Sequence, residues 1–437
     1  MQRRALLLGG LIYGLLLMGL ITLRGELLAL AIPLLLYLSA GLLYGPAPLR
    51  LAIARHLSTD RTTPEAPVTV TLTITNEGEP LEQLLLEDLV PPPLRVVEGE
   101  PQRLTSLPAG ATCELRYTVA GPRGYYLFPG LQVGASDHLG LFQRRTLLPA
   151  PGRLLVLPTP LKLRQVPIRP WRTRVYAGFI PARRGGPGVE FFSVRSYQPG
   201  DPLRWINWKA GARHPRALFT NEFRQERIAD VGVILDARRR RYVRRGEESL
   251  FEYAIQAATA LAEAFLNDGN RVGLLLYGRF VDWTFPGYGK VQRERIFQAL
   301  ARAEMGESLV FEKLEYLPTR LFPPHSQLVL VSPLAQEDLP TLIQLRARGY
   351  SLLVVSPDPI AFEVGAMADR PEVRLATRIA RLERALLFRQ LRQAGIGVLD
   401  WPVDQPFDRT VHATLSRRSL WVRGGPQIVG RAPATLR

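Results

Sequence analysis

Two aspartates, each followed by arginines, have the clearest potential for chemistry in this sequence. Asp201 comes after a Pro-Gly turn and precedes Arg204 and Arg213, and Asp236 ends an apolar run and precedes Arg238. Carboxylates at such positions can act as general acids or bases, or bind Mg²⁺ or Ca²⁺. A helix cap at Asp201 and ion pairs with the arginines explain the same residues equally well.

The motifs of the common hydrolases are absent from the sequence. There is no Gly-x-x-x-x-Gly-Lys-Ser/Thr loop, no Gly-x-Ser-x-Gly elbow and no His-Glu-x-x-His. The single cysteine, Cys113, excludes an intrachain disulfide framework. The five histidines do not have the spacing of metal ligands: His56, His138, His214, His325 and His412. We therefore predict a protein that is not an enzyme and that binds no metal and no cofactor.

The densest set of special residues lies in residues 190–223. Glu190–Tyr197 alternates and is aromatic, which predicts a strand, and the Pro-Gly pair after it predicts a turn. Asp201 is then placed to cap a helix over Leu203–Ala212. The pattern predicts a strand, a turn and a short helix in this order.

Aromatic and cationic residues alternate along the predicted helix. Arg204 would lie one turn from Trp208, and Trp205 one turn from Lys209, so that cation–π pairs could form. The two tryptophans could equally be core residues, because aromatic side chains usually pack in the interior.

This segment resembles the signature of the bacterial domain of unknown function 58 family. The family shows Glu-Phe, Arg-x-Tyr-x-Pro-Gly-Asp, Arg-x-Ile-x-Trp-Lys and Ala-Arg in this order. The matching residues here are Glu190-Phe191, Arg195 to Asp201, Arg204 to Lys209 and Ala212-Arg213, and the likeness continues at 121–125, at 137–142 and downstream to about residue 405. Our candidate interaction residues are Glu190, Arg195, Tyr197, Gly200, Asp201, Arg204, Trp208, Lys209 and Arg213, together with Asp236.

The resemblance implies both a partner and a fold. Members of the family are associated with MoxR-type AAA+ ATPases and are thought to act with them in the maturation or remodelling of other proteins, some near the cell envelope. Their C-terminal half is thought to share the von Willebrand factor A-like fold.

Residues 230–420 have the pattern of an open, mostly parallel sheet with helices between the strands. The predicted strands are Val231–Asp236, Val272–Tyr277, Gln327–Ser332, Leu352–Ser356 and Gly397–Trp401, and the predicted helices are Leu250–Leu266, 291–303, 335–348 and 377–394. Ligands of such sheets bind beyond the carboxyl ends of the strands, where the strand order reverses. The candidate site therefore lies near Asp236, Ser332 and Ser356.

The metal motif of von Willebrand factor A-like domains is altered here. Such domains hold a divalent cation with Asp-x-Ser-x-Ser after the first strand, but both serine positions are arginine in this chain, Arg238 and Arg240. Pro333 stands after Ser332, where an acidic ligand would be needed. Guanidinium groups offer no acceptor and repel a dication, so we expect Asp236 to pair with an arginine instead.

Two uncharged apolar runs precede the first predicted strand. Ala5–Leu23 and Leu27–Leu49 are each long enough to cross a hydrocarbon core of about 30 Å, which predicts a two-helix hairpin in residues 1–50 with helices over 5–23 and 27–45. Arginines flank the outer ends, so both termini are expected in the cytoplasm. A signal peptide and a hairpin buried in protein are the disfavoured alternatives.

Residues 60–160 have the pattern of an immunoglobulin-like β-sandwich, with alternating strands separated by Pro- and Gly-rich turns. The Pro, Gly and Arg content of residues 161–189 predicts a linker.

The net charge of +17 raises the question of a polyanionic partner. The arginines that carry most of this charge are spread along the chain, and their one dense block, Arg238–Arg241 with Arg244 and Arg245, has no stacking platform for bases beside it. Nucleic acid is therefore disfavoured as a ligand. Anionic lipid of the cytoplasmic leaflet is the favoured partner, because a basic protein held at the membrane lies within its reach.

These features together predict a multidomain protein of the cell membrane whose soluble domains face the cytoplasm. Our hypothesis is a non-enzymatic adaptor that works with a MoxR-type AAA+ ATPase. The alternatives are an uncharacterised hydrolase with a site near Asp201 and Asp236, and a basic protein that binds lipid or nucleic acid.

Overall fold

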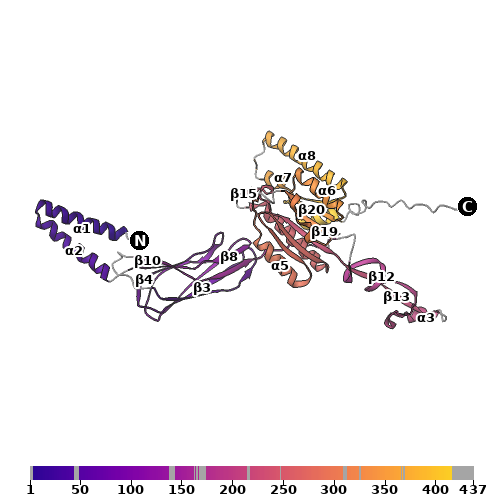
Figure 1. The fold of residues 1–437 in the computed structure, drawn as a ribbon, viewed down its shortest axis with the longest axis horizontal. Helices are drawn as coiled ribbons and strands as arrows, with labels where there is room; N and C mark the ends of the chain where they lie inside the picture. Colours follow the sequence, from indigo (N-terminus) through magenta and orange to yellow (C-terminus); the bar gives the residue numbers. More distant parts are fainter. Residues whose placement is uncertain are drawn as a thin grey trace. The chain divides into compact units, whose positions relative to one another are not determined.

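The chain divides into two compact units, Met1–Leu157 and Pro158–Arg437 (Figure 1). The structure, a computed structural model, describes residues 3–43, 49–136, 143–161, 163, 166, 174–213, 217–246, 248–308, 313–323, 326–365, 367 and 370–415.

Two apolar helices, α1 (Arg3–Thr22) and α2 (Gly25–Leu43), form a hairpin. The chain reverses at Leu23, which has a positive φ of 46°. The helices approach closely at Gly19, where a Cβ atom would lie 2.9 Å from Cδ2 of Leu28. The absence of a side chain at Gly19 therefore allows this contact.

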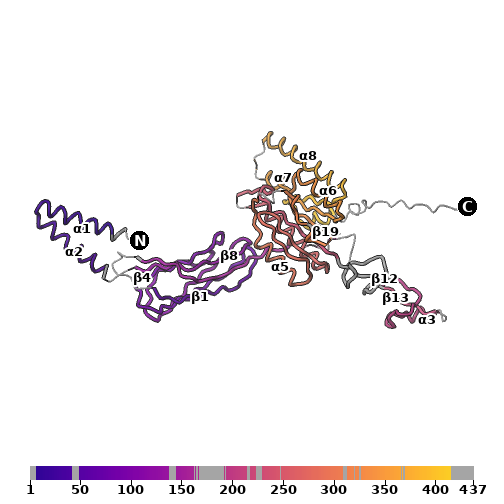
Figure 2. The backbone as a smooth tube through the Cα atoms, viewed as in Figure 1, coloured from indigo at the N-terminus to yellow at the C-terminus, as the bar shows by residue number. Residues whose placement is uncertain are grey.

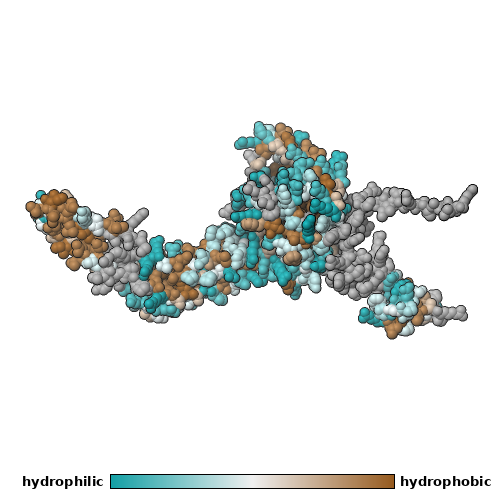
Figure 3. Space-filling model, viewed as in Figure 1, coloured by the Kyte–Doolittle hydropathy of each residue, from teal (hydrophilic) through white to brown (hydrophobic). Residues whose placement is uncertain are grey.

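Many apolar side chains of this hairpin are exposed, among them Leu7 at 74% and Ile21 at 73%, and both helices are coloured as hydrophobic over most of their surface in Figure 3. The sequence predicts two membrane spans here, over 5–23 and 27–45. Among the described residues, no helix combines the length and the apolar character that are needed to cross a membrane.

The described strands of the first unit form three sheets. The first has the order β1 (Leu51–Leu57), β3 (Val68–Asn76), β7 (Thr112–Ala120), β5 (Arg95–Gly99). The second has the order β10 (Gln143–Leu148), β9 (Leu131–Ser136), β4 (Leu81–Asp88), β6 (Gln102–Leu107). The third joins β2 (Arg61–Thr62), β11 (Gly152–Val156) and β8 (Gly124–Phe128). The backbone path is traced in Figure 2.

The two four-stranded sheets share one hydrophobic core. Alternate residues of β3 are fully buried, and they meet residues of β4, β7 and β9 in the same cluster. This period of two is the one that the sequence shows. The first strand, β1, lies before residue 60, where the predicted module starts. Its apolar alternation is weakened by a charged residue, Arg55, at an inward position.

Arg55 is buried in an ionic cluster inside this core. Its guanidinium donates to Asp88, to which Tyr117 also donates a hydrogen bond of 2.5 Å, and its Cζ lies 4.6 Å from the ring centroid of Phe128. Burial raises the pKa of Asp88, and the hydrogen bonds from Tyr117 and Arg55 oppose this rise. The cluster ties β1, β4 and β7 together.

The second unit contains a six-stranded sheet. Its order is β18 (Val281–Gly287), β17 (Arg271–Tyr277), β14 (Asp230–Asp236), β19 (Gln327–Val331), β20 (Ser351–Pro357), β21 (Gly397–Trp401). All neighbouring strands are parallel except β17 and β18. Counted along the chain, the order is 3-2-1-4-5-6, so the direction of winding reverses between β14 and β19.

Helices pack on this sheet (Figure 1). They are α4 (Leu250–Asn267), α5 (Gly289–Arg302), α6 (Leu339–Ala347), α7 (Pro359–Val364), α8 (Pro371–Gln393) and α9 (Phe407–Leu415). Every residue of β19 and β20 is buried, as in parallel sheets that are covered on both faces. The five strands and four helices that the sequence predicts in this region are present, whereas β18, α7 and α9 are not predicted.

A long antiparallel hairpin precedes this sheet along the chain. It consists of β12 (Arg174–Ser196) and β13 (Phe219–Ile228). The predicted linker over 161–189 is therefore wrong for residues 174–189, which are extended and pair with β13. Several register shifts accommodate the prolines and glycines that suggested a linker. Residues 162, 164–165 and 167–173 lie outside the described residues.

Candidate functional site

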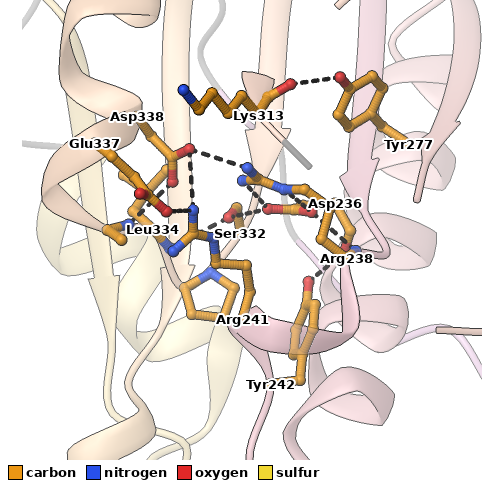
Figure 4. A network of polar contacts seen from close by, with 12 residues as sticks. Asp236, Arg238, Arg241, Tyr242, Tyr277, Lys313, Ser332, Leu334, Glu337 and Asp338 are labelled. Carbon is orange, nitrogen blue, oxygen red and sulfur yellow. Dashed lines mark hydrogen bonds and ion pairs between the residues drawn. The ribbon is translucent and has the colours of Figure 1, made fainter. Parts of the chain in front are cut away.

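The candidate site lies where β14 and β19 end side by side at the point where the strand order reverses. Asp236 is the last residue of β14 and Ser332 follows β19. The carboxyl ends of parallel strands meet at one edge of a sheet, so the topology brings both side chains to the usual ligand position of such sheets. Figure 4 shows the polar network at this edge.

The carboxylate of Asp236 is fully buried and hydrogen-bonded by Arg238 and Ser332. Arg238 donates from Nε to Oδ1 at 2.8 Å and from Nη2 to Oδ2 at 2.7 Å. The hydroxyl of Ser332 donates to Oδ2 at 2.6 Å. The predicted pairing of Asp236 with a neighbouring arginine is present, and the bidentate geometry makes it strong.

Asp338, in the 3-10 helix η5 (Gln336–Asp338), provides a second carboxylate. Nη1 of Arg238 donates to its Oδ1 at 3.1 Å, while the backbone N–H of Ala335 donates to Oδ2 at 3.0 Å. Asp338 is 2% exposed and Arg238 4% exposed. One buried guanidinium therefore bridges two buried carboxylates, one at the end of β14 and the other in η5, which follows the neighbouring strand β19.

A further arginine covers this network. Arg241 donates to Glu337 and lies 3.6 Å from Oδ1 of Asp338. Tyr242 donates from its hydroxyl to the backbone carbonyl of Asp236 at 2.5 Å. These contacts place η2 (Arg239–Arg241) over the strand ends.

The electrostatics keep Arg238 charged. Burial lowers the pKa of Arg238, but hydrogen bonds and charge from Asp236, with a further contribution from Asp338, outweigh burial and hold it above its usual value. A permanently protonated guanidinium cannot act as a general acid or base. Its fixed charge instead occupies the position between carboxylates that a cation would take. The described residues contain no group of three or more His, Cys, Asp or Glu side chains that could hold a metal ion.

An arginine also binds the carboxyl end of the next strand, β20. Arg384 of α8 donates from Nη2 to Oγ of Ser356 at 3.1 Å and to Oδ1 of Asp400 at 2.8 Å. Its Nη1 donates to the carbonyl of Pro333 at 3.2 Å. Ser356, expected near the site, thus belongs to a separate arginine-centred cluster that joins α8 to the sheet.

At the tip of the β12–β13 hairpin, Asp201 forms an ion pair with Arg195. Arg195 donates from Nη1 to Oδ2 at 2.9 Å and from Nη2 to Oδ1 at 2.7 Å, and the N–H of Gln198 donates to Oδ2 at 2.9 Å. These bonds lower the pKa of Asp201, so the pair persists at neutral pH and is lost only when acid protonates the carboxylate. The predicted role of Asp201 as a helix cap is wrong, because its oxygens close the turn around Gly200, whose φ is 108°.

The predicted helix over Leu203–Ala212 is divided in two. The 3-10 helix η1 (Leu203–Trp205) ends at Ile206, which forms an isolated bridge to Thr220 of β13, and α3 (Trp208–Arg213) follows. The cap of α3 is Asn207, whose Oδ1 accepts from the N–H of Ala210 at 2.9 Å. Pairing with β13 outweighs the local tendency to continue the helix.

This division changes the surroundings of the aromatic residues. Trp208 is 70% exposed, so the interpretation of this residue as core is wrong. Arg204 lies over the ring of its neighbour Trp205 at 5.9 Å, in place of the predicted pair with Trp208. Arg204, Lys209 and Arg213 are exposed as well.

The remaining candidates have backbone roles or lie outside the description. The N–H of Tyr197 donates to the carbonyl of Leu218 at 2.9 Å and helps to close the hairpin. Glu190 lies in β12, but its side chain is outside the described residues, as are residues 137–142 of the family likeness.

Sequence reasoning missed Asp338 and an aromatic surface. Asp338 stands at the start of the predicted helix 335–348 that follows a strand end, which is the signal that could have identified it. Phe285 in the edge strand β18, and Phe280 and Tyr288 next to its two ends, are 69–73% exposed. This strand was not predicted, so these aromatics could not be placed on a face.

Residues 193–360 match the sequence profile of the family described as "Protein of unknown function DUF58", and the chain therefore carries a domain of this family. The chain is also 27% identical over 205 residues to the uncharacterized protein YeaD of Bacillus subtilis (strain 168). This match covers 46% of the present chain and 49% of YeaD, so the chain spans about half the length of this curated relative.

Solved structures are similar to parts of the chain at low overall scores. A FixG-related protein from Vibrio parahaemolyticus is 14% identical with a TM-score of 0.17, over 25% of this chain and 97% of that protein. The sporulation control protein Spo0M from Bacillus subtilis is 12% identical with a TM-score of 0.14, over 25% of this chain and 50% of Spo0M.

Proposed function

We propose that this chain is a non-enzymatic adaptor at the membrane surface. It binds a MoxR-type AAA+ ATPase through the tip of the β12–β13 hairpin, and it thereby takes part in the remodelling of other proteins. The observation that carries the proposal is the exposure of Trp208 at 70%. A tryptophan exposed to this extent packs little against its own domain, and tryptophan and arginine are among the residues most often found at binding hot spots.

The surroundings of Trp208 support a binding surface. Leu203 is 73% exposed, and the cationic side chains of Arg204, Lys209 and Arg213 lie exposed on the same short segment. The pair between Arg195 and Asp201 holds the turn that presents this segment. We name the set Leu203, Arg204, Trp208, Lys209 and Arg213 the hairpin-tip surface. Its chemistry suits an apolar pocket rimmed by acidic groups.

The alternative of a hydrolase is less well supported by the geometry. A catalytic carboxylate needs a lone pair free for a proton or for water. Asp201 accepts from Arg195 and Gln198, and Asp236 accepts from Arg238 and Ser332. Both carboxylates are thus engaged within the chain, which favours the role of the domain as a scaffold for binding.

The proposed location is the cytoplasmic face of the cell membrane. The exposed apolar side chains of α1 and α2 need cover in water, and lipid provides it. The net charge of +17 suits an anionic leaflet. In this proposal, the α1–α2 hairpin keeps the chain at the membrane, and the β-sheets of the first unit and the whole second unit work in the cytoplasm.

The test is affinity purification of the full chain from native membranes, with the amount of co-purified AAA+ ATPase as the readout. Trp208→Ala and Arg213→Ala should each lower this amount about tenfold, as expected for hot-spot residues. The free energy of unfolding should change by less than about 1 kcal/mol, because both side chains are on the surface.

Tyr316→Ala is the matched control, because Tyr316 is an aromatic residue of the same unit and is 58% exposed. It should leave the recovery of the ATPase unchanged. Full recovery with both hairpin-tip variants would overturn the proposal, as would an equal loss with the control.

A further inference from the structure

Helix α8 carries a row of apolar side chains on its exposed face. Leu375 is 60% exposed, Ile379 50%, Leu382 64% and Leu386 59%. The successive spacings of four, three and four residues place these side chains in one stripe along the helix. Apolar colour lies along α8 at the surface in Figure 3. We name these residues the α8 stripe.

The opposite face of α8 fixes the helix to its own domain. Leu387, Phe388 and Leu391 are buried in the core cluster of the sheet, together with residues of α6. Arg384 is bound to Asp400 and Ser356 at the strand ends. The helix is therefore ordered by the fold, and the stripe is turned away from the surface that holds it.

The stripe has the pattern of a coiled-coil seam. With Ile379 and Leu386 at a positions, Leu375 and Leu382 fall at d positions of the heptad. A β-branched residue at a with leucine at d favours two strands. A seam of this length is marginal for an isolated peptide, but the fold has already ordered this helix before it meets a partner.

The charges beside the stripe select one partner and one orientation. Arg378 occupies the g position on one side, and Glu383 occupies the e position on the other side. Neither forms an ion pair within the described part of the chain. In a parallel pair of identical helices, each g residue faces the e residue five positions further along the partner, so Arg378 meets Glu383 twice. In an antiparallel pair, Arg378 would meet its own copy.

We propose that α8 pairs with α8 of a second copy of this chain as a parallel, two-stranded coiled coil. The stripe supplies the apolar contact, and the two pairs between Arg378 and Glu383 fix the register. This inference concerns a different surface from the hairpin tip, and it does not depend on the proposed partner. An anionic membrane is the main competing occupant, and it would attract Arg378 but repel Glu383.

A charge exchange on the full chain tests the proposal. The detergent-solubilised protein should have twice the mass of the 48.9 kDa chain by light scattering. Arg378→Glu and Glu383→Arg should each raise the dimer Kd about tenfold, since each places like charges across both contacts. The double variant Arg378→Glu/Glu383→Arg should return to within about twofold of the original Kd, because each contact again joins a positive and a negative side chain, with the two charges exchanged.

Disulfide formation in native membranes gives a second readout that needs no detergent. Leu382→Cys should form a disulfide-linked dimer, because d residues face each other across the seam. Arg381→Cys, exposed but off the stripe, should not.

Several outcomes would overturn the pairing: a monomer that also fails to cross-link at position 382, equal cross-linking at 381, or a double variant no tighter than the single ones. Binding of monomers to anionic vesicles that falls with Arg378→Glu and rises with Glu383→Arg would identify a lipid surface as the occupant instead. Circular dichroism checks that each variant remains folded.

Discussion

Arg238 supplies a fixed positive charge between two carboxylates that are buried at the ends of β14 and η5. The guanidinium satisfies Asp236 and Asp338 with bonds of 2.7–3.1 Å, so neither carboxylate is left unpaired in the interior. A buried charge without a partner is strongly destabilising, whereas a bound pair with good geometry is tolerated. One side chain therefore supplies, from within the chain, the positive charge that these two carboxylates need.

Removal of this guanidinium should destabilise the domain severely. Arg238→Ala leaves both carboxylates buried without their partner, and we expect a loss of about 3–5 kcal/mol in the free energy of unfolding. Denaturant titration of the full chain, followed at the transition of the second unit, measures this loss. Arg239→Ala is the control, since Arg239 is exposed, and it should change stability by less than about 0.5 kcal/mol. A comparable loss in the control would show that position 238 is not special.

Divalent cations should not stabilise the wild-type chain, because Arg238 already occupies the place between the carboxylates. A ligand that binds only the native state must raise the melting temperature. We therefore expect no saturable rise in melting temperature with millimolar Mg²⁺, Mn²⁺ or Ca²⁺ in differential scanning calorimetry. A metal-specific rise of several degrees would contradict this interpretation of the network.

At the scale of elements, the central strand β14 depends on a contact with the segment before β19. Gly232 packs under the ring of Phe322, and a Cβ atom there would lie 2.2 Å from Cε1 of Phe322. Phe322 is 2% exposed and belongs to the core cluster. The glycine is required by this close approach, and no unusual backbone angle is involved.

Gly232→Ala should therefore destabilise the second unit by about 1–3 kcal/mol, the usual effect of overpacking a core. Phe322→Leu in the same chain should recover part of the loss, because the smaller side chain leaves room for the methyl group. Gly211→Ala in α3 is the matched control, since no atom lies within 4 Å of its Cβ position, and it should be neutral or stabilising. Thermal unfolding of the three variants distinguishes these effects. A neutral Gly232→Ala would contradict the packing argument.

At the scale of the whole molecule, the proposed location follows from the hairpin and the charge. The exposed leucines and isoleucines of α1 and α2 exceed what a surface in water normally presents in one place. The rest of the first unit and the second unit contain the ionic clusters and the hairpin-tip surface. Association of the α1–α2 hairpin with lipid would leave these surfaces in the cytoplasm.

A reporter fused after Arg437 should accordingly be active in the cytoplasm, and the fusion should sediment with membranes. Deletion of residues 1–48 should release the fusion into the soluble fraction, because the apolar surface of both helices is then removed. Fractionation followed by immunoblotting measures both effects. Activity of the reporter outside the cytoplasm, or membrane sedimentation that survives the deletion, would overturn the proposed location.

The sequence by itself determined the elements whose patterns are local. Alternation along Val68–Ile74 predicts a strand, and the apolar run Val231–Asp236 predicts a buried strand, as the structure has them. Two arginines in place of serines after Asp236 were enough to predict that this carboxylate pairs with a guanidinium. These features can be predicted from sequence because the period of apolar side chains and the pairing of nearby charges depend on residues that are close together in the chain.

Tertiary structure alone decided the matters that depend on distant residues. Ile206 leaves the helix because it bridges to Thr220, and Trp208 is exposed as a consequence. Asp338 joins the site from 100 positions beyond Arg238, since the sheet brings two strand ends together. The α8 stripe is exposed because Arg384 and its neighbours attach the opposite face to the sheet. A sequence shows which face of a helix is apolar, but only the packed fold shows which face its own domain leaves uncovered.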